Sequence, residues 1–190
     1  MKKRNLLFVV LFFCSVLGFG QRLVQVGLQF GLGVPLNKKP LGLNFTMDKS
    51  TNFEVGAHVR IGKQFFGQVG AGYYVNKTFL NLDTLQSAVE LGQINIPILA
   101  GFRHALGKTT YFRCMLGIQY RGLVRVSKNI LEIDRNTFNK NNMDFIGGIG
   151  FDVSIITLDV SYRKAVVPLV KDSKNYQDVV NFSVGFLLFR

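Results

Sequence analysis

The stretch Val24-Gln25-Val26-Gly27-Leu28-Gln29-Phe30-Gly31-Leu32-Gly33-Val34 decides the fold class of this chain. Every second residue is apolar, and a glutamine or a glycine stands between each pair of apolar residues. A period of two places all the apolar side chains on one face of an extended strand and the polar or small ones on the other. The stretch therefore predicts a β-strand with two chemically different faces.

The same alternation recurs along the chain and predicts seven further strands. They cover approximately residues 52–61, 68–76, 93–103, 112–124, 143–153, 158–163 and 180–188. About eight consecutive two-faced strands fit an all-β fold, a closed antiparallel up-and-down barrel.

The connections between the expected strands favour a barrel that crosses a membrane. Those at 62–64, 106–110 and 154–156 are short, whereas those around 35–50, 77–88, 125–141 and 164–176 are long. Barrels of bacterial outer membranes have short turns at one end and longer loops at the other. A soluble barrel or sandwich is the alternative, but the chain has no tryptophan, which argues against the usual motif of the lipocalin type.

The N-terminus indicates export. Lys2, Lys3 and Arg4 precede an apolar run, and the small residues Gly18 and Gly20 stand at the positions that a signal peptidase reads. We expect residues 1–20 to be a cleaved signal peptide and residues 21–190 to form one outer-membrane β-barrel domain. A retained signal anchor and a lipoprotein cut at Cys14 are the alternatives.

The composition of the mature chain excludes several kinds of site. Its formal charge falls from +12 to +9 when the three basic residues of the signal leave. Cys114 is then the only cysteine, so no disulfide framework is expected, and His58 and His104 are too few for a histidine-based zinc site. We expect no cofactor and no metal.

The polar face of the strands carries charged residues and many glycines, and in a membrane barrel this face points into the lumen. The candidate lumen residues are Glu54, His58, Arg60, Arg103, Arg113, Arg121, Asp144, Asp152, Asp159 and Arg163. An eight-stranded barrel is narrow enough for side chains to fill it. The favoured interpretation is a structural network of ion pairs that plugs the lumen, because charges removed from water need partners; a polar pore and a buried catalytic cluster are the alternatives.

Aromatic residues fall towards the ends of the expected strands and could form belts at the membrane interfaces. They are Phe53, Phe65, Tyr111, Phe112, Tyr162, Phe182 and Phe189. A terminal strand that ends in Phe189 is similar to those presented to the barrel-assembly machinery, although Arg190 follows it.

Two stretches carry a resemblance to a known family. Ile94-Asn95-Ile96-Pro97-Ile98-Leu99-Ala100-Gly101-Phe102-Arg103 and Phe145-Ile146-Gly147-Gly148-Ile149-Gly150-Phe151-Asp152 resemble strands of the PorT-like outer-membrane β-barrel family. The resemblance also includes residues 158–163 and implies an eight-stranded barrel in the outer membrane of a Gram-negative cell. One named member of the family supports type IX protein secretion and gliding, so the resemblance implies this role as an alternative. It carries over no functional residues. Pro97 has no backbone N–H, so we expect strand pairing to be broken there, for example by a bulge.

The function class that follows is a structural or accessory envelope protein that acts through its loops or barrel wall. A component of type IX secretion is one alternative, and a barrel enzyme acting on outer-membrane lipid or peptide is another. An enzyme would need a nucleophile such as Ser161 or Ser183 beside a histidine. The sequence places neither serine within hydrogen-bond reach of His58 or His104, so we expect a structural lumen histidine and no enzyme.

Basic residues in or beside the long loops would face lipopolysaccharide and other outer-membrane lipid. They are Lys38, Lys39, Lys49, Arg125, Lys128, Arg135, Lys140, Lys164, Lys171 and Lys174. The other expected partners are the barrel-assembly machinery and envelope or secretion-system proteins. Nucleic acid is not an expected partner, because the signal peptide directs the chain out of the cytoplasm and no recognition motif is present.

Overall fold

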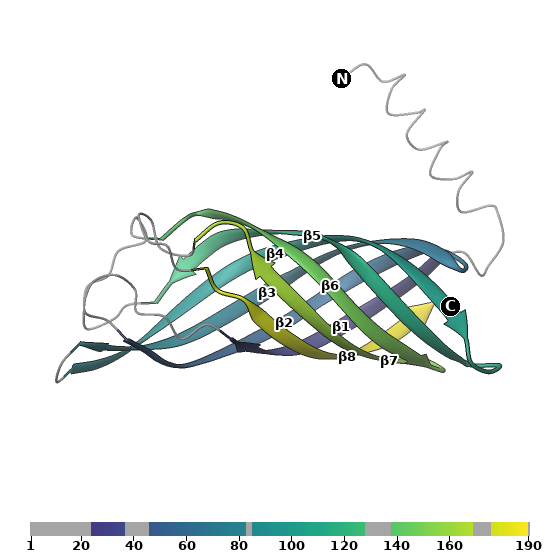
Figure 1. The fold of residues 1–190 in the computed structure, drawn as a ribbon, viewed down its shortest axis with the longest axis horizontal. Coiled ribbons are helices and arrows are strands. Elements are labelled where there is room, and N and C mark those ends of the chain that lie inside the picture. Colours follow the sequence, from purple (N-terminus) through teal and green to yellow (C-terminus); the bar gives the residue numbers. More distant parts are fainter. Residues whose placement is uncertain (1–23, 37–45, 83–84, 128–137, 169–175, 190) are drawn as a thin grey trace, which may run out of the picture.

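A computed structural model describes residues 24–36, 46–82, 85–127, 138–168 and 176–189. Eight strands form one closed antiparallel barrel in which each strand pairs with its neighbours in sequence and β1 pairs with β8 (Figure 1). The strands are β1 (Val24–Pro35), β2 (Thr46–Gly62), β3 (Phe65–Leu82), β4 (Leu85–Ala105), β5 (Thr110–Val126), β6 (Asn141–Val153), β7 (Ile156–Ala165) and β8 (Val179–Phe189). The predicted closed up-and-down barrel of eight strands is confirmed. The expected signal peptide, residues 1–20, lies outside the described residues and stays a prediction.

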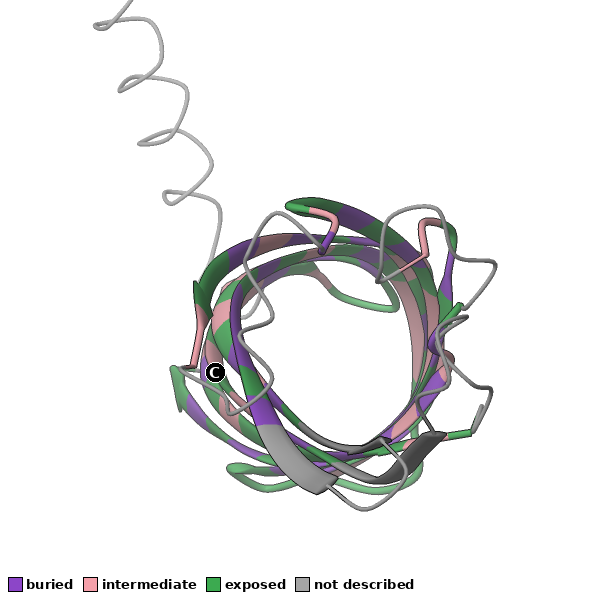
Figure 2. Ribbon diagram, turned by 90° about the vertical axis from the view of Figure 1, so that its left-hand side faces the viewer, coloured by how far each residue is buried: buried purple, intermediate pink, exposed green. Residues whose placement is uncertain are grey.

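Closure leaves no strand edge unpaired, which a barrel in hydrocarbon requires because lipid offers the backbone no hydrogen bonds. Viewed along its axis, the barrel is a ring in which buried and exposed residues alternate along each strand (Figure 2). On β6, for example, Asp144 is 2% exposed and its neighbour Phe145 is 60% exposed. The polar face thus points inward and the apolar face outward, as the alternation predicts.

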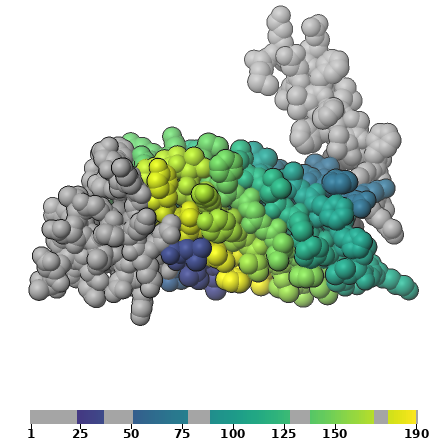
Figure 3. Space-filling view, viewed as in Figure 1, coloured from purple at the N-terminus to yellow at the C-terminus, as the bar shows by residue number. Residues whose placement is uncertain are grey.

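The outer wall carries apolar side chains. In Figure 3, the neighbouring strands β6, β7 and β8 lie side by side, in agreement with their pairing. Their outward residues include Ile149, Val160 and Phe182, all of them exposed. No helix in the described part of the chain is long and apolar enough to span a membrane.

The expected long loop at 77–88 is wrong. β3 continues to Leu82 and β4 begins at Leu85, and these two residues face each other across the end of a hairpin. Strands that leave the membrane can stay paired because their backbones satisfy each other in water as well as in lipid. The alternation of short and long connections therefore fails at this hairpin, which extends beyond the rest of the barrel on the left of Figure 1. β2 also begins at Thr46, earlier than expected.

The strands differ in length around the ring. β7 has 10 residues and β8 has 11, close to the roughly 9–11 that a tilted strand needs to cross a bilayer. β4 has 21 residues, so much of its length lies beyond the membrane. The short turns 63–64, 106–109 and 154–155 all lie at the opposite end, together with the start of β1 and the end of β8. This end is the periplasmic end of an outer-membrane barrel.

Pro97 interrupts pairing without a bulge. β3 and β4 pair at Val69–Ile98 and again at Gly72–Asn95 in the same register, and the positions between them are unpaired. Gly70 stands opposite Pro97, and a Cβ atom there would lie 3.1 Å from the proline Cγ. The glycine therefore makes room for the ring, and the expected break in pairing is confirmed in a milder form than a bulge.

Candidate functional site

The periplasmic half of the lumen holds a chain of ion pairs. Arg60 on β2 contacts Asp152 on β6 (Nη1 to Oδ2, 3.1 Å), and Arg113 on β5 contacts the other oxygen of Asp152 (Nε to Oδ1, 2.8 Å). Arg113 also reaches Asp159 on β7 (Nη2 to Oδ1, 2.9 Å). Arg60, Arg113 and Asp152 are at most 1% exposed. One carboxylate thus serves two arginines, and four strands are joined through the lumen.

Arg60 is held by further contacts. It donates hydrogen bonds to Gln25 Oε1 and Gln68 Oε1, both at 3.1 Å, and its guanidinium carbon lies 5.0 Å from the centre of the Phe66 ring. These partners come from β1 and β3, on either side of the strand that carries Arg60. The guanidinium is therefore fixed in the middle of the barrel by a carboxylate, two amides and an aromatic face.

A second cluster fills the extracellular half. Arg121 contacts Asp144 (Nε to Oδ2, 2.6 Å), and Asn95 donates to Glu54 at 2.5 Å. Arg163 approaches Glu54 to 3.7 Å. The buried ring of Tyr74 lies between the two arginines, with its centre 4.5 Å from the guanidinium carbon of Arg163 and 5.8 Å from that of Arg121. Tyr74 was not among the candidate residues of the sequence.

Glycine provides the space that the periplasmic cluster needs. A Cβ atom on Gly150 would collide with Asp159 Oδ1 and would lie 3.0 Å from Arg113 Nη2. Gly150 and Asp159 face each other on β6 and β7, so any side chain at this position would displace the ion pair. The lumen glycine here is a condition for the charged pair.

One sector of the lumen wall is apolar. Phe66, Leu99 and Met115 are buried and pack together with Ile146. They lie on the inward face of β3 to β6, which the sequence interpretation assigned to polar and small residues. The signal was present as pairs of adjacent apolar residues that break the alternation, such as Phe65-Phe66, Ile98-Leu99 and Met115-Leu116.

Two predicted lumen residues stand apart from the clusters. Arg103 lies at the periplasmic mouth, where its Nε donates to the backbone oxygen of Lys63 at 3.1 Å and its guanidinium carbon lies 4.9 Å from the centre of the Tyr111 ring. Tyr111 thus faces the mouth, and its expected place in an outer aromatic belt is wrong. His58 is buried beside a small cavity of about 20 Å³.

No nucleophile is paired with a histidine in the described part of the chain. Both ring nitrogens of His58 lack a hydrogen-bond partner there, and Ser183 bonds to Gln29 at 2.9 Å. His104 is exposed and stacks on Phe102, with the ring centres 6.5 Å apart. Within the described residues, no group of three or more His, Cys, Asp or Glu could hold a metal ion.

Exposed basic residues lie near the ends of strands at the end opposite the short turns. Arg125, Lys140 and Lys164 are exposed there. The other basic residues expected beside the loops, Lys38, Lys39, Lys128, Arg135, Lys171 and Lys174, lie outside the described residues, and of Lys49 only the backbone is described.

The closed barrel, the apolar outer wall and the ion-paired interior together define the class of protein. An apolar exterior around a polar core is the reverse of a water-soluble barrel and is stable only in lipid. The chain is a small transmembrane β-barrel of the bacterial outer membrane.

Comparisons with known proteins add the following. No model of a known protein family matches the chain, and no curated protein does. Among solved structures, the chain is similar to Ail, the attachment invasion locus protein of Yersinia pestis, with 9% identity, a TM-score of 0.47 and coverage of 86% of this chain and 96% of that one. LpxR from Salmonella typhimurium has 7% identity, a TM-score of 0.41 and coverage of 85% and 99%. The translocator domain of the autotransporter NalP from Neisseria meningitidis has 11% identity, a TM-score of 0.36 and coverage of 91% of each chain.

Proposed function

We propose that this barrel is a structural or accessory protein of the cell envelope, acting through its loops or its outer wall, and that its lumen conducts no solute. The observation that supports the proposal best is the ion pair between Arg60 on β2 and Asp152 on β6. In a ring of eight strands, β2 and β6 are four strands apart in either direction. The pair therefore crosses the lumen from one wall to the opposite wall.

A solute that passed through this barrel would have to separate Arg60 from Asp152. Both partners are 1% exposed, and breaking a buried ion pair by removing one partner costs about 3–5 kcal/mol because the other charge is left without compensation. The second cluster would have to open as well, since the Tyr74 ring lies between Arg121 and Arg163 on the extracellular side of the first cluster. Two successive barriers of this kind favour a static, filled interior.

The test is a conductance measurement on the mature chain, residues 21–190, in planar bilayers. We expect no large stable current from protein that is shown to be folded by its heat-dependent mobility on a gel. A clear porin-like current from the folded protein, absent from heat-denatured protein, would contradict the proposal.

A role in type IX protein secretion and gliding is the more specific proposal that the PorT-like resemblance supports. Deleting the gene in its own host and measuring export of the system's cargo tests it. Reduced export, restored by the intact gene, would support this role; normal export would remove it.

The exposed cations at the extracellular end support lipopolysaccharide as a lipid partner. Arg125, Lys140 and Lys164 are exposed there, and cations near a phosphate-bearing surface gain electrostatic attraction. Exchanging Lys140 and Lys164 for glutamine should weaken binding to lipopolysaccharide micelles, and unchanged binding would count against this partner.

A further inference from the structure

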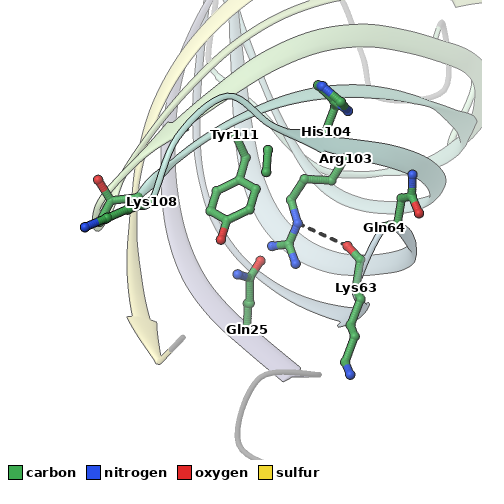
Figure 4. A pocket seen from close by; sticks show the side chains of 9 residues that line it. Gln25, Lys63, Gln64, Arg103, His104, Lys108 and Tyr111 are labelled. Carbon is green, nitrogen blue, oxygen red and sulfur yellow. Dashed lines mark hydrogen bonds between the residues drawn. The ribbon is translucent and has the colours of Figure 1, made fainter.

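The periplasmic mouth of the barrel contains a pocket of about 770 Å³ next to the Arg60 cluster. Its lining comes from the start of β1, the β2–β3 turn, the end of β4, the β4–β5 turn and the start of β5. It includes Gln25, Lys63, Arg103, Lys108 and Tyr111 (Figure 4). Lys63, Arg103 and Lys108 are cationic, and no acidic residue is among the described residues that line the pocket. The volume is in the range of sites that take small organic molecules or a few residues of peptide.

The pocket is built from fixed groups. The backbone N–H of Arg103 donates to Gln64 O at 2.7 Å and its side-chain Nε donates to Lys63 O at 3.1 Å, so Arg103 ties the end of β4 to the β2–β3 turn twice. Its guanidinium lies over the Tyr111 ring. In Figure 4 the side chains of Arg103 and Tyr111 extend into the same space, and Gln25 lies beside them.

The neighbouring part of the rim, at the β4–β5 turn, is also held by hydrogen bonds. Leu106 N donates to Thr110 O at 2.9 Å within the β4–β5 turn, and Ser154 N donates to Thr109 O at 2.9 Å, which joins this turn to the β6–β7 turn. Lys108 is carried by this braced turn. An anion would therefore meet cations on two turns whose backbones are already held, and little ordering would be needed on binding.

We propose that this mouth is a binding site for an acidic peptide segment from the periplasm, held by its carboxylates. Arg103, Lys63 and Lys108 can meet carboxylates with charge-assisted hydrogen bonds, the two lysines from exposed side chains at the rim. Gln25, which also lines the pocket, accepts a hydrogen bond from Arg60 at its side-chain oxygen, and its amide N–H groups are further potential donors. The lining is thus rich in donors and positive charge, which suits a multiply anionic and hydrophilic ligand.

The direction of the side chains favours a periplasmic peptide over an anionic lipid headgroup. Gln25, Arg103 and Tyr111 point into the barrel mouth, whereas lipid would meet the outer face (Figure 4). His104 also lines the pocket, and its ring stacks on Phe102. The site does not depend on the proposed accessory role, because it would exist at the mouth of a plugged or an open barrel.

The test measures binding of a fluorescent peptide of four glutamates to the mature protein in zwitterionic nanodiscs, with a peptide of four glutamines as control. We expect the acidic peptide to bind with an affinity that falls as salt is raised, and the glutamine peptide not to bind. In the double variant Lys63→Gln/Lys108→Gln, the affinity should fall about two- to thirtyfold, because two exposed charge pairs are lost.

The matched control removes the same charge from the other end of the barrel. Lys140→Gln/Lys164→Gln should bind the peptide as the wild type does. Equal losses in the two double variants would show that net charge alone is responsible and would overturn the site. Absence of peptide binding would also overturn it, as would binding that appears only when anionic phospholipid is added to the nanodisc.

The variant Arg103→Lys separates geometry from charge. It keeps the cation but loses the planar group that lies over Tyr111, so we expect weaker binding with a folded barrel by gel mobility. Wild-type affinity in this variant would contradict the assigned role of Arg103.

Discussion

Asp152 is the residue whose loss should damage the barrel most. Its two oxygens contact Arg60 at 3.1 Å and Arg113 at 2.8 Å, and all three side chains are at most 1% exposed. Replacing Asp152 with asparagine keeps the shape and removes the charge, which leaves two buried guanidinium groups with one fewer anion between them. Because breaking a buried pair costs about 3–5 kcal/mol, we expect the free energy of unfolding of Asp152→Asn to fall by that amount.

The assay is urea unfolding of the barrel refolded in lipid vesicles, followed by far-UV circular dichroism and by the fraction of protein that keeps its folded mobility on an unheated gel. The chain has no tryptophan, so its intrinsic tryptophan fluorescence cannot be the probe. The control is Glu90→Gln, which breaks the pair of Lys77 and Glu90 at 3.0 Å, where both side chains are 47% exposed. An exposed pair of this kind is worth about 0–1 kcal/mol.

A double-mutant cycle isolates the crossing itself. Arg60→Met combined with Asp152→Asn should cost less than the sum of the two single changes, because Arg60→Met removes the buried guanidinium that Asp152→Asn leaves without its carboxylate. Additive effects, or a loss in Asp152→Asn no larger than in Glu90→Gln, would refute the reasoning that the lumen pairs hold the barrel together.

Two further predictions concern single positions. Gly150→Ala should destabilise the barrel by about 1–3 kcal/mol, as overpacking does, because the new methyl group collides with Asp159 of the Arg113 ion pair. Gly67 has open space around it, so Gly67→Ala should be neutral in the same urea assay. Equal effects of the two changes would contradict the steric argument. Cys114 is exposed on the outer wall, where its neighbours on β4 and β6 are Phe102 and Ile149. In bilayers it should therefore resist a charged maleimide that labels it in urea. If Cys114 in the folded protein reacts as fast as a cysteine added by Lys164→Cys, it faces water and the prediction is wrong.

Which residues of a strand point inward and which point outward was predictable from the sequence, because this direction depends only on the local alternation of residues. Asp144 is buried and Phe145 is exposed because adjacent residues of a strand point to opposite faces and the lipid lies outside the barrel. The length of β3 and β4 beyond the membrane was not predictable in this way, since strands in water lose the requirement for an apolar outer face. Their alternation fades before their pairing ends.

The candidate site was predictable as a set of residues and not as a set of contacts. Arg60 and Asp152 are separated by 92 positions in sequence, and their meeting depends on the diameter and stagger of the closed ring. Tyr74 was overlooked because a lone tyrosine on the polar face carries no charge, although its ring lies against two arginines. The apolar sector around Met115 was overlooked because it interrupts the alternation only in pairs of residues.

The pairing of β1 with β8 is the most direct test of the closed barrel, because every other strand pair would also exist in an open sheet. The measurement is amide-to-amide nuclear Overhauser contacts in deuterated protein of residues 21–190 in micelles. We predict cross-strand contacts along the register that joins Phe30 to Val184 and Leu32 to Phe182, with slow hydrogen exchange on both strands. Contacts between β1 and β2 without any between β1 and β8, together with fast exchange along β8, would contradict the closed barrel.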